Sequence, residues 1–121
     1  MKVVDASAIA CLLFDEPRAE EVAERLADSR LAAPTLLRYE VASVCRQKGQ
    51  RHPDQREMLL AALGFLPELG IEELDVPADD VARLASELEI TASAAAYAWL
   101  QQALDAELVT LDEDLEEATR F

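Results

Sequence analysis

The chain has 121 residues, of which 51% are hydrophobic and 30% charged, and its formal net charge at pH 7 is −14. This length and apolar content are typical of one domain with one core, so we expect residues 1–121 to form a single domain. No apolar stretch is long enough to span a bilayer and no secretory signal pattern is present, which predicts a cytoplasmic protein without membrane contact. Two distant cysteines and one histidine give no support to a disulfide framework or a zinc site.

Short apolar runs and helical periodicities alternate along the chain. Strands are predicted at residues 2–5, 31–33, 71–76 and 107–111, and helices at 7–13, 15–29, 36–48, 53–67, 77–88, 91–104 and onward from 112. The helix at 36–48 is predicted to end at Gly49, because glycine often follows a helix C-terminus. Such alternation implies right-handed crossovers between parallel strands. It predicts an α/β fold with three α/β/α layers and a central parallel sheet of four to five strands.

Two of the predicted strands end on a carboxylate. Asp5 follows the apolar pair Val3 and Val4, and Asp112 follows the apolar run 108–111. Ligands of open parallel sheets bind outside the carboxyl ends of the strands, so Asp5 and Asp112 are predicted to face one another. Glu40 is a third candidate, because it stands alone in an apolar helix while most acids of this chain occur in clusters. Carboxylates of this kind suit Mg²⁺ or Mn²⁺.

Each of these residues also has a purely structural interpretation. Asp5 and Asp112 are favourable helix N-caps, and Glu40 fits an ordinary amphipathic helix. Ser7 and Thr110, which lie beside the two aspartates, either orient ligands or simply bond to the backbone. The residues alone leave both interpretations open.

The positive charge is concentrated in one segment. Residues 38–56 hold five of the eleven basic side chains against two acids, which gives a local charge of +3. This indicates a phosphate-facing edge on an otherwise acidic protein, and a solvated helix face is the alternative. The basic residues predicted to hold a phosphate backbone are Arg38, Arg46, Lys48 and Arg51.

Three segments, taken in order, carry a resemblance to a known family. They are MKVVDASA at 1–8, APTLLRYEVA at 33–42 and LVTLD at 108–112. Together they resemble a PIN domain of the VapC toxin type, over essentially the whole chain. The resemblance implies a PIN-like fold and a Mg²⁺- or Mn²⁺-dependent endoribonuclease, the toxin of a type II toxin–antitoxin system. By matching position, Asp5, Glu40 and Asp112 would bind the metal and carry catalysis, with Ser7 and Thr110 in support.

One position departs from the family pattern. The segment TASAAAY at 91–97 aligns with a family segment that usually carries Tyr-Asp before Ala-Ala-Tyr, so the expected aspartate falls on Ala94. A missing carboxylate should weaken metal binding and catalysis, and Asp114 is a candidate to replace it in part. Three explanations stay open: a naturally weakened nuclease, a PIN-domain binding protein without catalysis, and a deliberate Asp-to-Ala change.

Two protein partners are expected besides RNA. The acidic surface suits the basic segment of a cognate antitoxin, because opposite charges favour and steer association. The apolar helices at 36–66 offer a self-complementary surface for a homodimer. Both expectations depend on surfaces that the sequence does not locate.

Overall fold

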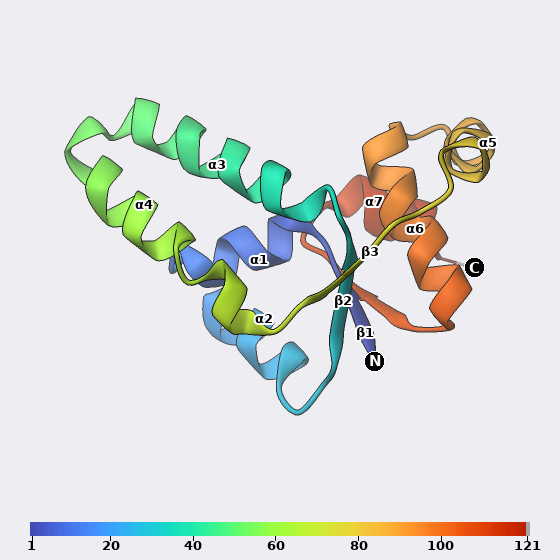
Figure 1. The fold of residues 1–121 in the computed structure, drawn as a ribbon, viewed down its shortest axis with the longest axis horizontal. Helices are drawn as coiled ribbons and strands as arrows, with labels where there is room; N and C mark the ends of the chain where they lie inside the picture. The colour runs from blue at the N-terminus through green and yellow to red at the C-terminus, as the bar shows by residue number, and fades with distance from the viewer. Residues whose placement is uncertain (121) are drawn as a thin grey trace.

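The computed structural model describes residues 1–120, which form a parallel sheet flanked by helices (Figure 1). The strands are β1 (Lys2–Val4), β2 (Leu31–Pro34), β3 (Glu72–Leu74) and β4 (Glu107–Val109), in the spatial order β3-β2-β1-β4. The α-helices are α1 (Ala6–Leu13), α2 (Ala19–Leu26), α3 (Leu37–Arg51), α4 (Arg56–Leu63), α5 (Ala78–Leu88), α6 (Ala92–Leu104) and α7 (Glu113–Ala118), with short 3-10 helices η1 (Pro53–Gln55) and η2 (Leu66–Leu69). The predicted α/β fold is confirmed, with four strands in the described residues.

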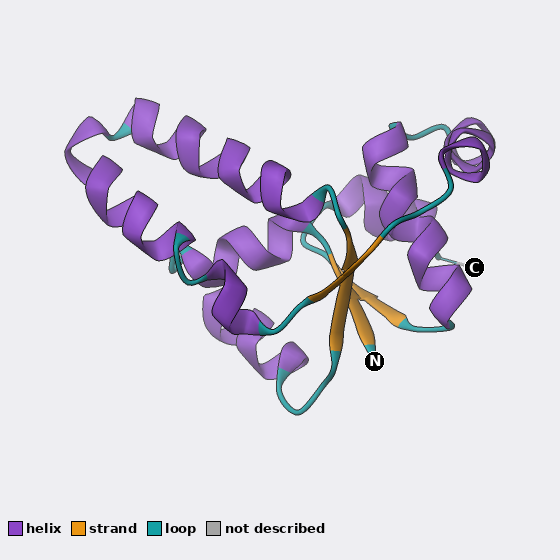
Figure 2. Cartoon of the chain, viewed as in Figure 1, coloured by secondary structure: helices purple, strands orange, loops and turns teal. Residues whose placement is uncertain are grey.

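The sheet lies between two groups of helices (Figure 2). The helices α1 to α4 occupy one side of the strands, and α5, α6 and α7 occupy the other. Val3, Val4 and Val109 are fully buried in the core, together with Ile9 of α1. Strands that are apolar on both faces are expected in a parallel sheet covered on both sides, and the helices provide that cover here.

The position of β1 in the sheet creates the crevice in which a ligand can bind. β1 pairs with β2 on one side and with β4 on the other, and all three strands run parallel. The chain therefore leaves β1 in one direction and later returns to its opposite edge. Crevices in open α/β sheets form at such reversals, outside the carboxyl ends of the strands. Asp5 and residues 110–112 lie at this point, directly after β1 and β4.

The hairpin of α3 and α4 extends away from the sheet (Figure 1). The predicted end of α3 at Gly49 is wrong, because the helix continues to Arg51. Gly49 lies inside the helix, where an added β-carbon would be 3.7 Å from Cγ of Arg56. The helix ends because Pro53 follows His52, whose backbone is extended at φ −132° and ψ 74°. A residue before proline disfavours the helical conformation, and proline has no N–H to continue it.

The helices of the described chain are also short. The longest, α3, has 15 residues. No helix within residues 1–120 is long and apolar enough to cross a membrane.

Candidate acidic site

Asp5 is both a helix cap and a member of the predicted site. Its Oδ1 accepts hydrogen bonds from the backbone N–H of Ala8 at 3.0 Å and from Oγ of Ser7 at 2.7 Å, while Oδ2 accepts from Oγ1 of Thr110 at 2.5 Å. The residue is 5% exposed. The capping interpretation and the site interpretation are therefore compatible, because the cap fixes the carboxylate at the end of β1.

Ser7 and Thr110 join the ends of β1 and β4. Oγ of Ser7 accepts from the backbone N–H of Leu111 at 2.9 Å, and Oγ1 of Thr110 accepts from the N–H of Asp112 at 3.0 Å. Both hydroxyls also donate to Asp5, so each one links a carboxylate to the opposite strand end. The two hydroxyls thus tie the strand ends to Asp5, and their supporting role in the site stays a prediction.

Glu40 reaches the same region from the first turn of α3. Its Oε1 accepts a hydrogen bond of 2.5 Å from Oη of Tyr97, a tyrosine of α6 that is 2% exposed. The sequence analysis missed Tyr97 as a functional residue. A signal was nevertheless present, because residues three apart lie on the same face of a helix and Tyr97 follows Ala94 by three.

The predicted acids converge on one pocket. Asp5, Glu40 and Asp112 line a cavity of about 160 Å³, and Ser7, Ala94 and Tyr97 line it with them. The methyl group of Ala94 therefore stands at the pocket wall, where the family pattern has a carboxylate. Asp114 lines a larger adjoining cleft, whose wall also includes Ala94 and Asp112, so its role as a partial replacement for that carboxylate stays a prediction.

Residues 2–120 match the PIN domain family. The chain belongs to this family. PIN domains are generally metal-dependent nucleases, so the pocket of acids lies in a fold that usually performs this chemistry. The crystal structure of PAE2754 from Pyrobaculum aerophilum has the same fold, with a TM-score of 0.80 and 24% sequence identity over 98% of this chain and 84% of that one. No curated protein matches this chain in sequence.

Burial makes the charged form of two acids in this PIN domain costly. The pKa of Asp5 is raised chiefly by burial and slightly by the charge of Asp112, while hydrogen bonds from Thr110, Ser7 and Ala8 oppose the rise. The pKa of Glu40 is raised by burial and by the charge of Asp5, against the hydrogen bond from Tyr97. Burial and the bond to Glu40 also raise the pKa of Tyr97, which keeps its hydroxyl protonated as a donor.

The donor set of this PIN domain is chemically suited to a hard divalent cation, since carboxylate oxygens are the preferred ligands of Mg²⁺ and Mn²⁺. A cation would also offset the cost of burying these charges and the smaller repulsion between them, which together raise the pKa of Asp5 and of Glu40. Across residues 1–120, however, no three Asp, Glu, His or Cys side chains are grouped closely enough to form a ready-made metal cluster. Ala94 contributes a methyl group and no carboxylate to the pocket wall.

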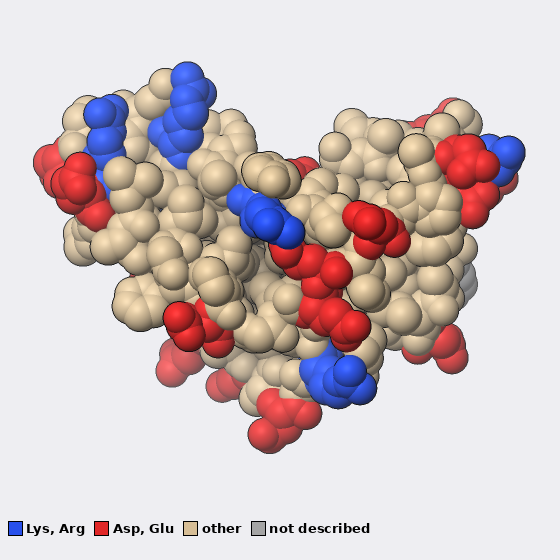
Figure 3. All heavy atoms as spheres, viewed as in Figure 1, with Lys and Arg blue, Asp and Glu red and all other residues tan. Residues whose placement is uncertain are grey.

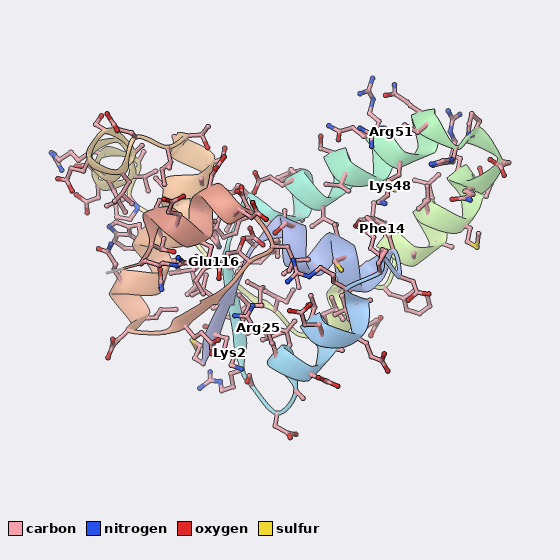
Figure 4. The ribbon with its side chains drawn as sticks, turned by 180° about the vertical axis from the view of Figure 1, so that it is seen from behind. Lys2, Phe14, Arg25, Lys48, Arg51 and Glu116 are labelled. Carbon is pink, nitrogen blue, oxygen red and sulfur yellow. The ribbon has the colours of Figure 1, made fainter. Side chains whose placement is uncertain are left out.

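The four predicted RNA-binding cations of this PIN domain divide into two pairs. Arg38 forms an ion pair with Glu73 at 2.6 Å, and Lys48 forms one with Glu16 at 3.6 Å. Figure 4 shows Lys48 on the side of α3 that faces Phe14, and Arg51 near the outer end of the helix. Arg46 and Arg51 are exposed, and neither forms an ion pair with a residue in the described range. Their charges are thus the ones available to a phosphate.

Proposed function

We propose that this PIN domain is a Mg²⁺- or Mn²⁺-dependent endoribonuclease, the toxin of a VapBC-like type II toxin–antitoxin system. The observation that supports the proposal is the convergence of Asp5, Glu40 and Asp112 on one pocket at the carboxyl ends of β1 and β4. These acids come from three separate segments of the chain, and each is placed by a different element. Helix capping and an amphipathic helix pattern alone give no reason for these three acids to line the same pocket.

The three acids of the pocket are positioned in different ways to bind a cation. A bound divalent cation would lower the pKa of a coordinated water and offset charge on phosphate oxygens. Asp5 is fixed through both oxygens: Oδ1 accepts from two donors, whereas Oδ2 accepts only from Thr110 and retains a second lone pair for a ligand. Glu40 is positioned by Tyr97 through Oε1, and Asp112 caps α7 through Oδ1. Each of these two residues therefore has its other oxygen available to the pocket.

A second candidate function is a PIN-domain binding protein with weak or no catalysis. Two observations favour it: Ala94 lines the pocket with a methyl group, and the described acids form no metal cluster. In this case the fold and the partner surfaces are retained while the chemistry is reduced. The two candidates differ only in whether the chain cleaves RNA.

The deciding experiment is cleavage of a fluorescent single-stranded RNA by this chain and by Ala94→Asp, each with Mn²⁺, Mg²⁺ or EDTA. Metal-dependent cleavage by the unchanged chain supports the ribonuclease. Cleavage by Ala94→Asp alone indicates an intact site that lacks one carboxylate. If neither protein cleaves RNA with any metal, the binding protein is the better description.

The toxin–antitoxin part of the proposal requires a basic partner. A cleft of about 700 Å³ adjoins the acidic pocket, and its wall includes Glu89, Asp112, Asp114 and Glu117 around the apolar Leu115. An acidic rim with an apolar floor suits an arginine or lysine side chain, whose stem is apolar and whose head is charged. Copurification of a basic protein with this chain, and its loss on Asp114→Lys with Glu117→Lys, would support this assignment.

The proposed homodimer has a different surface available. Met58, Leu60 and Phe65 are 68%, 50% and 63% exposed, and they lie on α4 and the turn that follows it. Exposed large apolar side chains favour association. Sedimentation equilibrium of the chain and of Phe65→Glu tests the proposal, which predicts a dimer that the charged variant weakens.

A further inference from the structure

Tyr39 is the most exposed large hydrophobic residue of the described chain. Its side chain is 70% exposed, although it is next in sequence to Glu40, whose carboxylate lines the acidic pocket. Arg38 lies over its ring, with Cζ 5.7 Å from the centroid, and Arg38 is itself held by an ion pair with Glu73. A cation at this distance attracts an aromatic face. The ring is therefore held in place beside the site while most of its surface faces solvent.

The exposed face of α3 continues from Tyr39 away from the site. Helical spacing places Tyr39, Ser43, Arg46 and Gln50 on one face, and all of them are exposed. The opposite face, with Val41 and Cys45, is buried in the core. We call the four exposed residues the α3 track.

The charge of the α3 track differs from that of the whole chain. Residues 41–53 contain no acid, in a chain whose formal net charge is −14. Figure 3 shows Lys and Arg atoms over the outer part of the α3–α4 hairpin, with Asp and Glu atoms at its tip and over most of the lower face of the molecule. A polyanion that reaches the acidic pocket would meet the least repulsion along this helix.

We propose that the α3 track binds single-stranded RNA next to the acidic pocket, with a base stacked on Tyr39 and a phosphate held by Arg46. The proposal rests on the ribonuclease function above for its substrate, but it concerns binding and not cleavage. A single strand is required because only an unstacked base can lie on an aromatic ring. Arg46 is seven residues beyond Tyr39, about 10 Å along the helix, which suits a contact with a neighbouring part of the same strand.

A protein partner fits the α3 track less well than RNA does. Tyr39 is its one large apolar side chain, whereas stable protein interfaces need a contiguous apolar core. The exposed apolar residues that would form such a core, Met58, Leu60 and Phe65, lie on α4 and the following turn. The track instead combines one aromatic platform with hydroxyl, amide and guanidinium groups, as single-strand binding surfaces do.

The test is fluorescence anisotropy of a short labelled single-stranded RNA with the full chain in EDTA, at salt concentrations from about 50 to 200 mM. Stacking energies for one base predict that Tyr39→Ala weakens binding by about 5- to 150-fold, with no change in the salt dependence. Tyr39→Phe should bind as the unchanged chain does. Arg46→Ala should reduce the slope of log affinity against log salt by about 0.7, as expected for the loss of one phosphate contact. The matched control is Arg30→Ala, which removes an exposed arginine from the start of β2 and should leave the slope unchanged.

The outcomes separate this proposal from the proposed function. The stacking role is overturned if Tyr39→Ala binds RNA as the unchanged chain does, or if it loses affinity equally for single-stranded and duplex RNA. It is also overturned if the unchanged chain does not bind RNA. If Tyr39→Ala instead changes the sedimentation of the chain, the residue belongs to a protein interface and the proposal is wrong. Binding that depends on Tyr39 without cleavage by Ala94→Asp would refute the ribonuclease and leave the track intact.

Discussion

The acidic pocket and the α3–α4 hairpin show opposite ways of presenting polar groups. In the pocket, Asp5 is 5% exposed and Thr110 is 4% exposed, and hydrogen bonds fix both of them. On the hairpin, Tyr39 is 70% exposed and Arg46 projects into solvent. The pocket is preorganised and its charges repel one another, whereas the hairpin presents exposed side chains and carries the opposite charge. A reaction at one bond requires buried groups that hydrogen bonds hold in place, as in the pocket. Binding of a flexible polymer favours exposed side chains, as on the hairpin.

The largest effect is expected from a substitution in the pocket that leaves the hairpin unchanged. In the Ala94→Asp background, Asp5→Asn should lower Mn²⁺-dependent RNA cleavage by at least about 100-fold, because losing even a supporting residue of a metal site commonly costs 10- to 100-fold. The measurement is the rate of cleavage of a fluorescent RNA. Asp79→Asn is the matched control, since Asp79 is an exposed acid of α5 that lines neither the pocket nor the adjoining cleft, and it should retain the rate. Equal losses in both variants would contradict the assignment of Asp5 to the site.

A smaller effect is expected when a hydrogen bond that positions a pocket side chain is removed. Tyr97→Phe removes the hydrogen bond to Glu40 and should reduce Mn²⁺ affinity in the Ala94→Asp background by about 10-fold, as outer-shell changes at metal sites do. The free energy of unfolding should fall by about 1 kcal/mol, the net value of one hydrogen bond. Calorimetric titration and thermal unfolding measure the two quantities. Trp99→Phe, on the same helix but outside the pocket, should leave the affinity for Mn²⁺ unchanged.

The contrast between the regions also explains which features could be predicted from sequence. Asp5 and Asp112 follow apolar strands directly, so the rule for parallel sheets located them. Tyr97 was missed because its role depends on Glu40, which is 57 residues away and is brought near only by the packing of α3 against the rest of the fold. The sequence likewise does not reveal that Glu73 and Glu16 lie beside Arg38 and Lys48. A residue at a strand end can be recognised from its neighbours in the sequence, whereas a contact between two helices joins residues that are far apart in it.

The pH dependence of stability tests the cost of burying the charged carboxylate of Asp5 in the pocket. An acid whose pKa is higher in the folded chain than in the unfolded chain destabilises the fold when it is ionised, and that cost disappears as pH falls through the folded pKa. Burial raises the pKa of Asp5 in this way. Without metal, Asp5→Asn should therefore have a higher Tm than the unchanged chain at neutral pH, and the difference should shrink as pH is lowered.

Adding Mn²⁺ should reverse this order of stability. Ligand at 100 times its Kd stabilises a protein by about 2.7 kcal/mol, and only the chain that retains Asp5 should gain this amount. Thermal unfolding of both proteins at several pH values, with Mn²⁺ and with EDTA, provides the comparison. A variant that is less stable than the unchanged chain at every pH would show that the charge of Asp5 is fully compensated by its hydrogen bonds.

The smallest expected effect concerns the hairpin and the helix end that the sequence misplaced. Gly49 is inside α3, and an added β-carbon would meet Arg56 Cγ at 3.7 Å, which is an ordinary contact. Gly49→Ala should therefore stabilise the chain by about 0.5–1 kcal/mol, the difference between glycine and alanine inside a helix. Gly70→Ala is the matched control and should destabilise it, because Gly70 has a φ of +65°. Denaturant unfolding distinguishes a helix that continues through Gly49 from one that ends there. If α3 ended at Gly49 in a left-handed cap, both substitutions would destabilise the protein. Stabilisation by Gly49→Ala alone would show that Pro53, and not the glycine, ends the helix that carries the α3 track.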